Sequence, residues 1–125
     1  MRLLLDTHVF LWVVTDSARL SEEARRLLES ADVVFVSSAS IWEIAIKARL
    51  GKIEADPARM LDAIEATGFQ ELPVLGRHAA WVVKLPLHHR DPFDRLLLAQ
   101  AIIEPMRLVT GDEQLLAYSE LVIRV

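Results

Sequence analysis

Two short apolar runs constrain the fold most strongly, because no polar residue interrupts either of them. They are Leu3-Leu4-Leu5 and Val33-Val34-Phe35-Val36. A strand that is apolar at every position is buried on both faces, and such strands occur in parallel sheets covered by helices above and below. The two runs therefore predict an α/β architecture with helices on both sides of the sheet.

Signals for helix and strand alternate along the rest of the chain. Ser21, Asp56-Pro57 and Asp91-Pro92 have the residue types that begin helices, and Gly51 is a plausible helix end. The alternation predicts one three-layer α/β/α domain over residues 1–125, with a mostly parallel central sheet. Further strands are expected over 107–110, 121–125 and, more weakly, 69–75. Helices are expected over 9–14, 21–31, 40–51, 56–68, 76–85, 112–118 and from 92 onward.

Composition narrows the class of protein. A chain of 125 residues favours a single domain, and a hydrophobic content of 53% suits a sheet buried on both faces or an apolar surface for self-association. The absence of cysteine excludes disulfides and thiolate metal sites.

Asp6 and His8 interrupt the N-terminal apolar stretch, which argues against a signal peptide, and no run reaches the ~18 residues of a membrane span. A soluble intracellular protein is expected. The net charge of −4 argues against binding nucleic acid through a general positive field.

Four acidic residues fall where a parallel sheet would bring them together. Asp6 directly follows the first strand, and Asp112 follows the strand at 107–110. Glu43 lies on the helix after the second strand, and Asp94 lies in the first turn of the helix that begins at Pro92. Sites in open parallel sheets form beyond the carboxyl ends of the strands, so all four side chains could reach one crevice. Converging carboxylates need a cation, and oxygen ligands favour Mg²⁺ or Mn²⁺, which can activate water against a phosphodiester.

Each acid also has a purely structural interpretation. Asp6, Asp91 and Asp112 are suitable helix N-caps. The role of Asp94 could be limited to a favourable interaction with the helix dipole. Glu43 could form a solvated ion pair with Lys47, four residues later, although its neighbours are apolar.

Four stretches taken together resemble PIN-domain proteins, specifically the VapC family of toxins from toxin–antitoxin pairs. Their order and spacing match that family from end to end of the chain. The stretches are residues 3–8 (LLLDTH), 38–47 (SASIWEIAIK), 91–95 (DPFDR) with 99–101 (AQA), and 110–112 (TGD).

The resemblance implies an endoribonuclease, dependent on Mg²⁺ or Mn²⁺, that hydrolyses RNA with metal-activated water. It implies that Asp6, Glu43, Asp94 and Asp112 are the catalytic, metal-binding acids, with support from Thr7, Thr110 and, further out, Asp91. The expected partners are an RNA substrate and a cognate antitoxin that blocks the site with a C-terminal segment. A cytoplasmic homodimer is also expected.

Two other functions stay open at this stage. One is a non-catalytic interaction module that keeps the PIN fold and binds a partner through an apolar surface. The other is a Mg²⁺-dependent phosphatase-type domain, which would need a nucleophilic aspartate working with a lysine or threonine. Asp6-Thr7 supplies the aspartate, but no lysine is placed convincingly beside it.

Several residues are assigned structural roles rather than chemistry. The His88-His89-Arg90 segment is interpreted as a polar loop before the helix at Pro92. Lys47, Arg49 and Lys52 form either a solvated helix face or an RNA contact. The tryptophans Trp12, Trp42 and Trp81 are expected in the core or a dimer interface rather than as stacking platforms for bases. Trp81, Val82 and Val83 are candidates for the dimer surface.

Overall fold

The computed structural model describes residues 1–88 and 90–125, and a five-stranded sheet lies at its centre. The strand order is β3-β2-β1-β4-β5, and all four neighbouring pairs are parallel. The prediction of a mostly parallel sheet is confirmed. The strands are β1 (Arg2–Leu5), β2 (Val33–Ser37), β3 (Gln70–Leu72), β4 (Arg107–Thr110) and β5 (Val122–Arg124).

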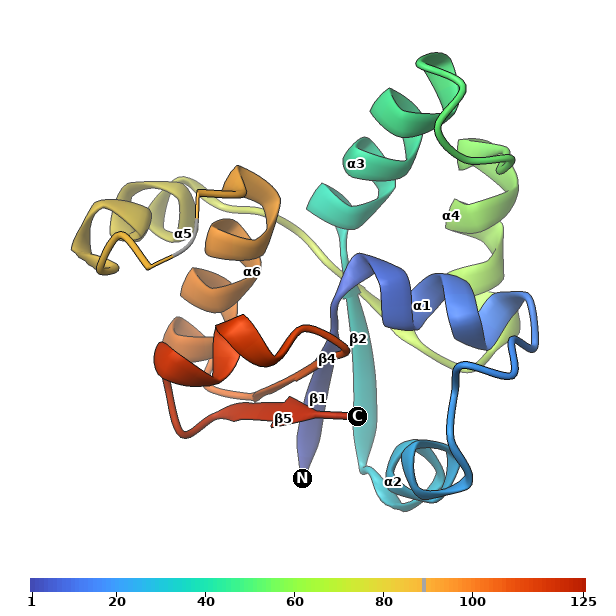
Figure 1. The fold of residues 1–125 in the computed structure, drawn as a ribbon, viewed down its shortest axis with the longest axis horizontal. Coiled ribbons are helices and arrows are strands. Elements are labelled where there is room, and N and C mark those ends of the chain that lie inside the picture. The colour runs from blue at the N-terminus through green and yellow to red at the C-terminus, as the bar shows by residue number, and fades with distance from the viewer. Residues whose placement is uncertain (89) are drawn as a thin grey trace.

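Helices cover both faces of the sheet, so the predicted three-layer architecture is confirmed. Figure 1 shows α1, α2 and α4 on one side of the sheet and α5 and α6 on the other. In the described part of the chain, no helix is long and apolar enough to cross a membrane. The α-helices are α1 (Thr7–Val14), α2 (Glu22–Ser30), α3 (Ser38–Arg49), α4 (Pro57–Ala66), α5 (Gly76–Trp81) and α6 (Pro92–Ile103); the 3-10 helices are η1 (Val82–Lys84) and η2 (Glu113–Ala117).

The central strand β1 explains why an unbroken apolar run is needed. Leu3 and Leu5 belong to the core beneath α1, together with Phe10. Leu4 points to the opposite face and packs in the core beneath α6, together with Leu98. Successive strand residues face opposite sides of a sheet, and all three leucines are fully buried. A polar residue at any of these positions would therefore enter one core or the other.

Three elements differ from the sequence prediction. The strand expected over 69–75 is confined to Gln70–Leu72, because Pro73 cannot donate a ladder hydrogen bond. The helix expected over 76–85 ends at Trp81 and continues as the 3-10 turn η1. The helix expected over 112–118 is also a 3-10 segment, η2. Short connecting helices commonly tighten to 3-10 geometry, which hydrophobic periodicity does not distinguish from a short α-helix.

A buried histidine fixes α5 against the end of α6. His78 is 1% exposed, and its Nδ1 accepts the backbone N–H of Leu75 at 2.9 Å. The ring proton is therefore on Nε2, which donates to Glu104 at 2.5 Å. The carboxylate also accepts a bond from Arg77 at 3.0 Å. The bond from His78, with the positive charges of Arg77 and Arg2, holds the pKa of Glu104 below its ordinary value.

Replacing Glu104 with alanine is expected to cost about 1–3 kcal/mol of stability, since the buried His78 N–H then has no acceptor. Glu104→Gln keeps an acceptor and should lose less. Because folding lowers the pKa of Glu104, its contribution is complete above the unfolded pKa and is lost as pH falls through the folded pKa. Urea denaturation at neutral and acidic pH measures both effects. Equal stability of Glu104→Ala and wild type at neutral pH would contradict this account.

Candidate active site

The strand order places a crevice between the carboxyl ends of β1 and β4. From β1 the chain moves to β2 and β3 on one side, and then crosses to β4 and β5 on the other. Connections leaving neighbouring strands in opposite directions open the sheet edge at that point, where α/β proteins bind ligands. Asp6 follows β1, and Asp112 follows β4 by one intervening residue. Two of the predicted acids therefore lie at the switch point.

Asp6 is a helix cap and a buried carboxylate at the same time. Its side chain is almost fully buried, and its Oδ1 accepts the N–H of Val9 at 2.8 Å, which caps α1. Its Oδ2 accepts the hydroxyl of Thr110 at 2.5 Å. Burial raises the pKa of Asp6 above its ordinary value, although these two hydrogen bonds and the nearby His8 oppose the shift. The cap interpretation is correct, and it does not exclude a functional role.

Thr110 joins the two acids at the ends of β1 and β4. It is fully buried; its Oγ1 donates to Asp6 and accepts the N–H of Asp112 at 3.0 Å. Asp112 caps η2 by accepting the N–H of Gln114 at 2.9 Å. One hydroxyl thus sets the positions of both acids, which suits the supporting role predicted for Thr110.

The N-terminus of α6 supplies two further carboxylates. Asp91 caps the helix, and its Oδ1 accepts the N–H groups of Phe93 at 2.9 Å and Asp94 at 3.3 Å. Pro92 occupies the first helical position, where no N–H is needed. Asp94 lies in the first turn, near the positive end of the helix dipole.

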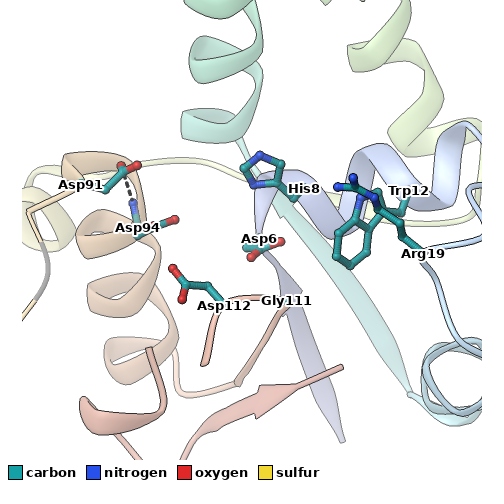
Figure 2. A pocket seen from close by; sticks show the side chains of 8 residues that line it. All are labelled: Asp6, His8, Trp12, Arg19, Asp91, Asp94, Gly111 and Asp112. Atoms are coloured by element: carbon teal, nitrogen blue, oxygen red, sulfur yellow. Dashed lines mark hydrogen bonds between the residues drawn. The ribbon is translucent and has the colours of Figure 1, made fainter. Parts of the chain in front are cut away.

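These four aspartates line one cavity of about 420 Å³. Figure 2 shows Asp91, Asp94 and Asp112 on the α6 side of this cavity and Asp6 at its centre. The structure therefore brings together three of the four acids predicted to be catalytic, and Asp91 with them. The complete lining is Asp6, His8, Trp12, Arg19, Asp91, Asp94, Gly111 and Asp112.

Glu43 is absent from this lining, and its ion pair is not the solvated one considered from sequence. The residue is 3% exposed, and its Oε2 accepts from Lys47 at 2.8 Å. Its Oε1 is buried without a hydrogen-bond partner among the described residues. The Glu43 bond raises the pKa of Lys47, and the charges of Asp91 and Asp94 add to that effect. Glu43 is therefore not part of the cavity lining, although its partner Lys47 senses the charges of the two α6 aspartates.

The remaining sequence candidates lie outside the cavity. Thr7 donates through its hydroxyl to Ser40 at 2.9 Å, which ties α1 to α3. His88 is exposed and contacts the ring of Tyr118 edge-on, and His89 lies outside the described residues. Trp42 is 61% exposed and contacts the ring of Phe93 edge-on, so it is not a core residue. Trp81, by contrast, packs against the core beneath α6.

Sequence reasoning did not assign His8, Trp12 and Arg19 to the site. His8 and Trp12 are four residues apart on α1, so they lie on one face of that helix. Trp12 rests on Gly111, where an added Cβ would lie 2.6 Å from the indole ring. The i, i+4 spacing directly after Asp6 was the available signal for His8 and Trp12. Arg19 had none, because it reaches the cavity from a loop.

Replacing Gly111 with alanine is expected to push the Trp12 ring out of place, because the new methyl group overlaps it. The displaced ring and the shifted Thr110-Gly111-Asp112 turn should lower stability by about 1–3 kcal/mol, the usual range for overpacking. Tryptophan fluorescence and thermal unfolding measure the effect. Gly76→Ala is the control, because a Cβ there meets nothing within 4 Å. Identical behaviour of the two variants would contradict the packing argument.

The donor set suits a hard divalent cation better than any soft metal. The acidic side of the cavity offers only carboxylate oxygens, the ligands that Mg²⁺ and Mn²⁺ prefer. The raised pKa of buried Asp6 means that its charge lacks full compensation. Within residues 1–88 and 90–125, no three carboxylate or imidazole groups already form a ligand set around one point. A cation held here would thus require side-chain movement.

Comparisons with known proteins identify the family of the chain. A family model described as the PIN domain matches residues 3–121. Ribonuclease VapC22 of Mycobacterium tuberculosis is 36% identical over 114 residues, covering 90% of this chain and 88% of that protein.

Two solved structures share the fold. One is VapBC2 from Rickettsia felis bound to a promoter DNA fragment, with a TM-score of 0.72 and 17% identity, covering 100% of this chain and 98% of the other. The other is a toxin–antitoxin complex from Klebsiella pneumoniae, with a TM-score of 0.67 and 18% identity, covering 96% and 94% of the two chains.

Proposed function

Because this chain belongs to the PIN domain family, and to the VapC ribonucleases within it, we propose that it is a divalent-metal-dependent endoribonuclease and the toxin of a toxin–antitoxin pair. One observation carries the proposal. Asp6 and Asp112, from the ends of two adjacent strands, are joined through Thr110 and line one cavity together with Asp94. The ribonuclease relative supports the reaction, and the antitoxin complexes support the partner.

In the mechanism we propose, Asp6, Asp94 and Asp112 would hold Mg²⁺ or Mn²⁺. The bound cation would lower the pKa of a water molecule and stabilise charge on the phosphoryl oxygens. Thr110 keeps one oxygen of Asp6 oriented, and the α1 cap keeps the other. Asp91 orients the first turn of α6 and thereby Asp94. We propose that Glu43, whose Oε1 is buried without a partner among the described residues, completes the acidic set when the cation is present.

The cleavage experiment uses purified protein and a mixed pool of cellular RNA. Reactions contain Mn²⁺, Mg²⁺ or a chelator, and the products are separated by gel electrophoresis. RNA cleavage that needs the metal supports the proposal. Folded, metal-supplied protein that leaves every RNA intact would instead favour a non-catalytic interaction module. Turnover of small phosphomonoesters without RNA cleavage would favour a phosphatase, although no lysine lines the cavity in the part of the chain described here.

We also propose that the protein forms a homodimer and acts in the cytoplasm, where its RNA substrate and antitoxin would be found. Large apolar side chains are exposed on the side of the molecule that carries η1 and the loop after it. Val83 and Leu87 are each 84% exposed, whereas Trp81 and Val82 are half-buried. Of the three residues expected on the dimer surface, Val83 is thus the best placed, and light scattering of the purified protein measures its mass.

A further inference from the structure

The cavity is electrostatically divided, and the mechanism proposed above uses only one side of it. Figure 2 shows His8, Trp12 and Arg19 together on the α1 side, opposite Asp91, Asp94 and Asp112. We call these three residues the α1 wall. A polyanionic substrate is repelled by four aspartates, so its phosphates need positive charge beyond that of a bound cation. Of the residues lining the cavity, Arg19 and His8 are the basic ones.

The loop that carries Arg19 is fixed by other residues. Asp16 adopts a left-handed conformation (φ 51°) and pairs with Arg25 at 2.9 Å. The backbone N–H of Ser17 donates to the carbonyl of Trp12 at 2.9 Å, and its Oγ accepts the N–H of Arg19 at 3.2 Å. Leu20 anchors the loop in the core. The Arg19 backbone is thus held beside the cavity.

The Arg19 side chain, unlike its backbone, makes no contact with the described residues that would stabilise the fold. Arg19 is exposed, and no described residue forms an ion pair or hydrogen bond with its guanidinium. By contrast, Arg25 holds the loop through Asp16 and through the carbonyl of Ser17 at 3.3 Å. An exposed arginine on a rigid loop at the mouth of an acidic cavity has its donors available to an anionic ligand.

Trp12 adds a rigid, flat apolar surface beside that arginine. Its ring is fixed by contact with Gly111 and by packing against the core beneath α1. Aromatic rings next to arginine are the usual means of holding single-stranded nucleic acid, because bases pack on the ring and phosphates pair with the guanidinium. The cavity volume of about 420 Å³ is in the range of pockets that hold small groups.

We propose that the α1 wall is the substrate-strand subsite of this nuclease. In this assignment Arg19 binds an RNA phosphate next to the one that is cut, and Trp12 packs against the adjoining nucleoside. The assignment rests on the proposed ribonuclease activity. It gives the cavity two functions: the aspartates act on the scissile phosphate, and the α1 wall sets the register of the strand.

The test measures kcat and KM for Arg19→Gln, Arg19→Lys and Trp12→Leu, with Mn²⁺ and the cellular RNA that wild type cuts fastest. Arg19→Gln is expected to raise KM about tenfold, as for loss of a charged hydrogen bond, with little change in kcat. The salt dependence of log KM should fall by about 0.7, the value for one phosphate contact on a single strand. Arg19→Lys should restore the salt dependence, because it keeps the charge. Trp12→Leu should raise KM without changing the salt dependence.

Arg26→Gln is the matched control, since Arg26 is exposed on α2 and outside the cavity, and the change in net charge is the same. Circular dichroism verifies that each variant is folded. If wild type cuts RNA and Arg19→Gln keeps its KM and salt dependence, the subsite is overturned while the ribonuclease stands. Weakened antitoxin binding with unchanged KM would also overturn it, in favour of a peptide site. If wild type cuts no RNA with either metal, the proposed function fails and the subsite fails with it.

Discussion

Replacing Asp6 with asparagine is expected to abolish RNA cleavage while leaving the fold intact. Asparagine keeps an oxygen that can accept the N–H of Val9, so the cap of α1 survives, and it is itself a good N-cap residue. What is lost is the negative charge next to Thr110 at the switch point. Metal-assisted activation of water is worth several kcal/mol, and each 1.4 kcal/mol is a factor of ten in rate. The rate should therefore fall by at least about a hundredfold.

The same substitution has two opposing effects on stability when no metal is present, because it removes a buried charge and also the acceptor of the Thr110 hydroxyl. Burial raises the folded-state pKa of Asp6, so the folded protein binds the proton more tightly than the unfolded chain does. The contribution of Asp6 to stability therefore decreases as pH rises from the unfolded pKa through the folded pKa, and at neutral pH it is a cost. Asparagine carries no charge and avoids that cost. A change in stability that is small beside the loss of activity is the pattern expected of a ligand residue.

Thermal unfolding with and without Mn²⁺ separates metal binding from structure. A ligand that binds only the folded state at ten times its Kd adds about 1.4 kcal/mol, so the Tm of wild type should rise when Mn²⁺ is added. The Tm of Asp6→Asn should not. Asp62→Asn is the control, because Asp62 is exposed on α4 and is not among the residues that line the acidic cavity. A variant at Asp6 that cuts RNA at the wild-type rate would remove this residue from the proposed acidic site.

The fold could be predicted from the sequence because its two strongest signals are local and agree. Unbroken apolar runs gave the buried strands β1 and β2, and cap residues such as Ser21 and Asp91 marked where helices begin. The edges were less well predicted. Pro73 shortens β3, and the short helices η1 and η2 are 3-10 turns, because such details depend on the hydrogen bonds available at each end.

The acidic side of the site was accessible to sequence reasoning, but its opposite side was not. Asp6 and Asp112 each follow a strand, so strand order alone brings them together. Asp6 and Asp112 are helix caps and candidate ligands at the same time, so the two interpretations do not exclude each other. Glu43 is not part of the lining, because its side chain on α3 is buried in the interior. Arg19 reaches the cavity through a loop whose shape depends on Asp16 and Arg25, which no periodic pattern encodes.

The largest loss of stability is expected from Arg95→Met. Arg95 is 8% exposed on α6, and its guanidinium donates to backbone carbonyls of the segment before α6: Pro86 at 2.8 Å, Val82 at 3.2 Å and Leu85 at 3.2 Å. Methionine retains the apolar stem but no donor. The carbonyl of Val82 still accepts the N–H of Leu85 at 3.1 Å, so those of Pro86 and Leu85 are the ones that lose their donor. Such carbonyls in a partly buried place cost about 1–3 kcal/mol each, less where water can reach them. We therefore expect a loss of about 3 kcal/mol in the free energy of unfolding.

Urea denaturation measures that loss, and hydrogen exchange locates it. Exchange should increase first over 82–86, because Arg95 fixes that segment to α6, and Arg95→Lys should lose less because an ammonium group still donates. Arg59→Met, whose side chain is 84% exposed, is the control and should change stability by less than about 0.5 kcal/mol. Wild-type stability in Arg95→Met would mean that water satisfies these carbonyls at no cost. Arg95 directly follows Asp94, so a folded Arg95→Met protein with lowered kcat would show that anchoring this segment also positions the acidic turn of α6.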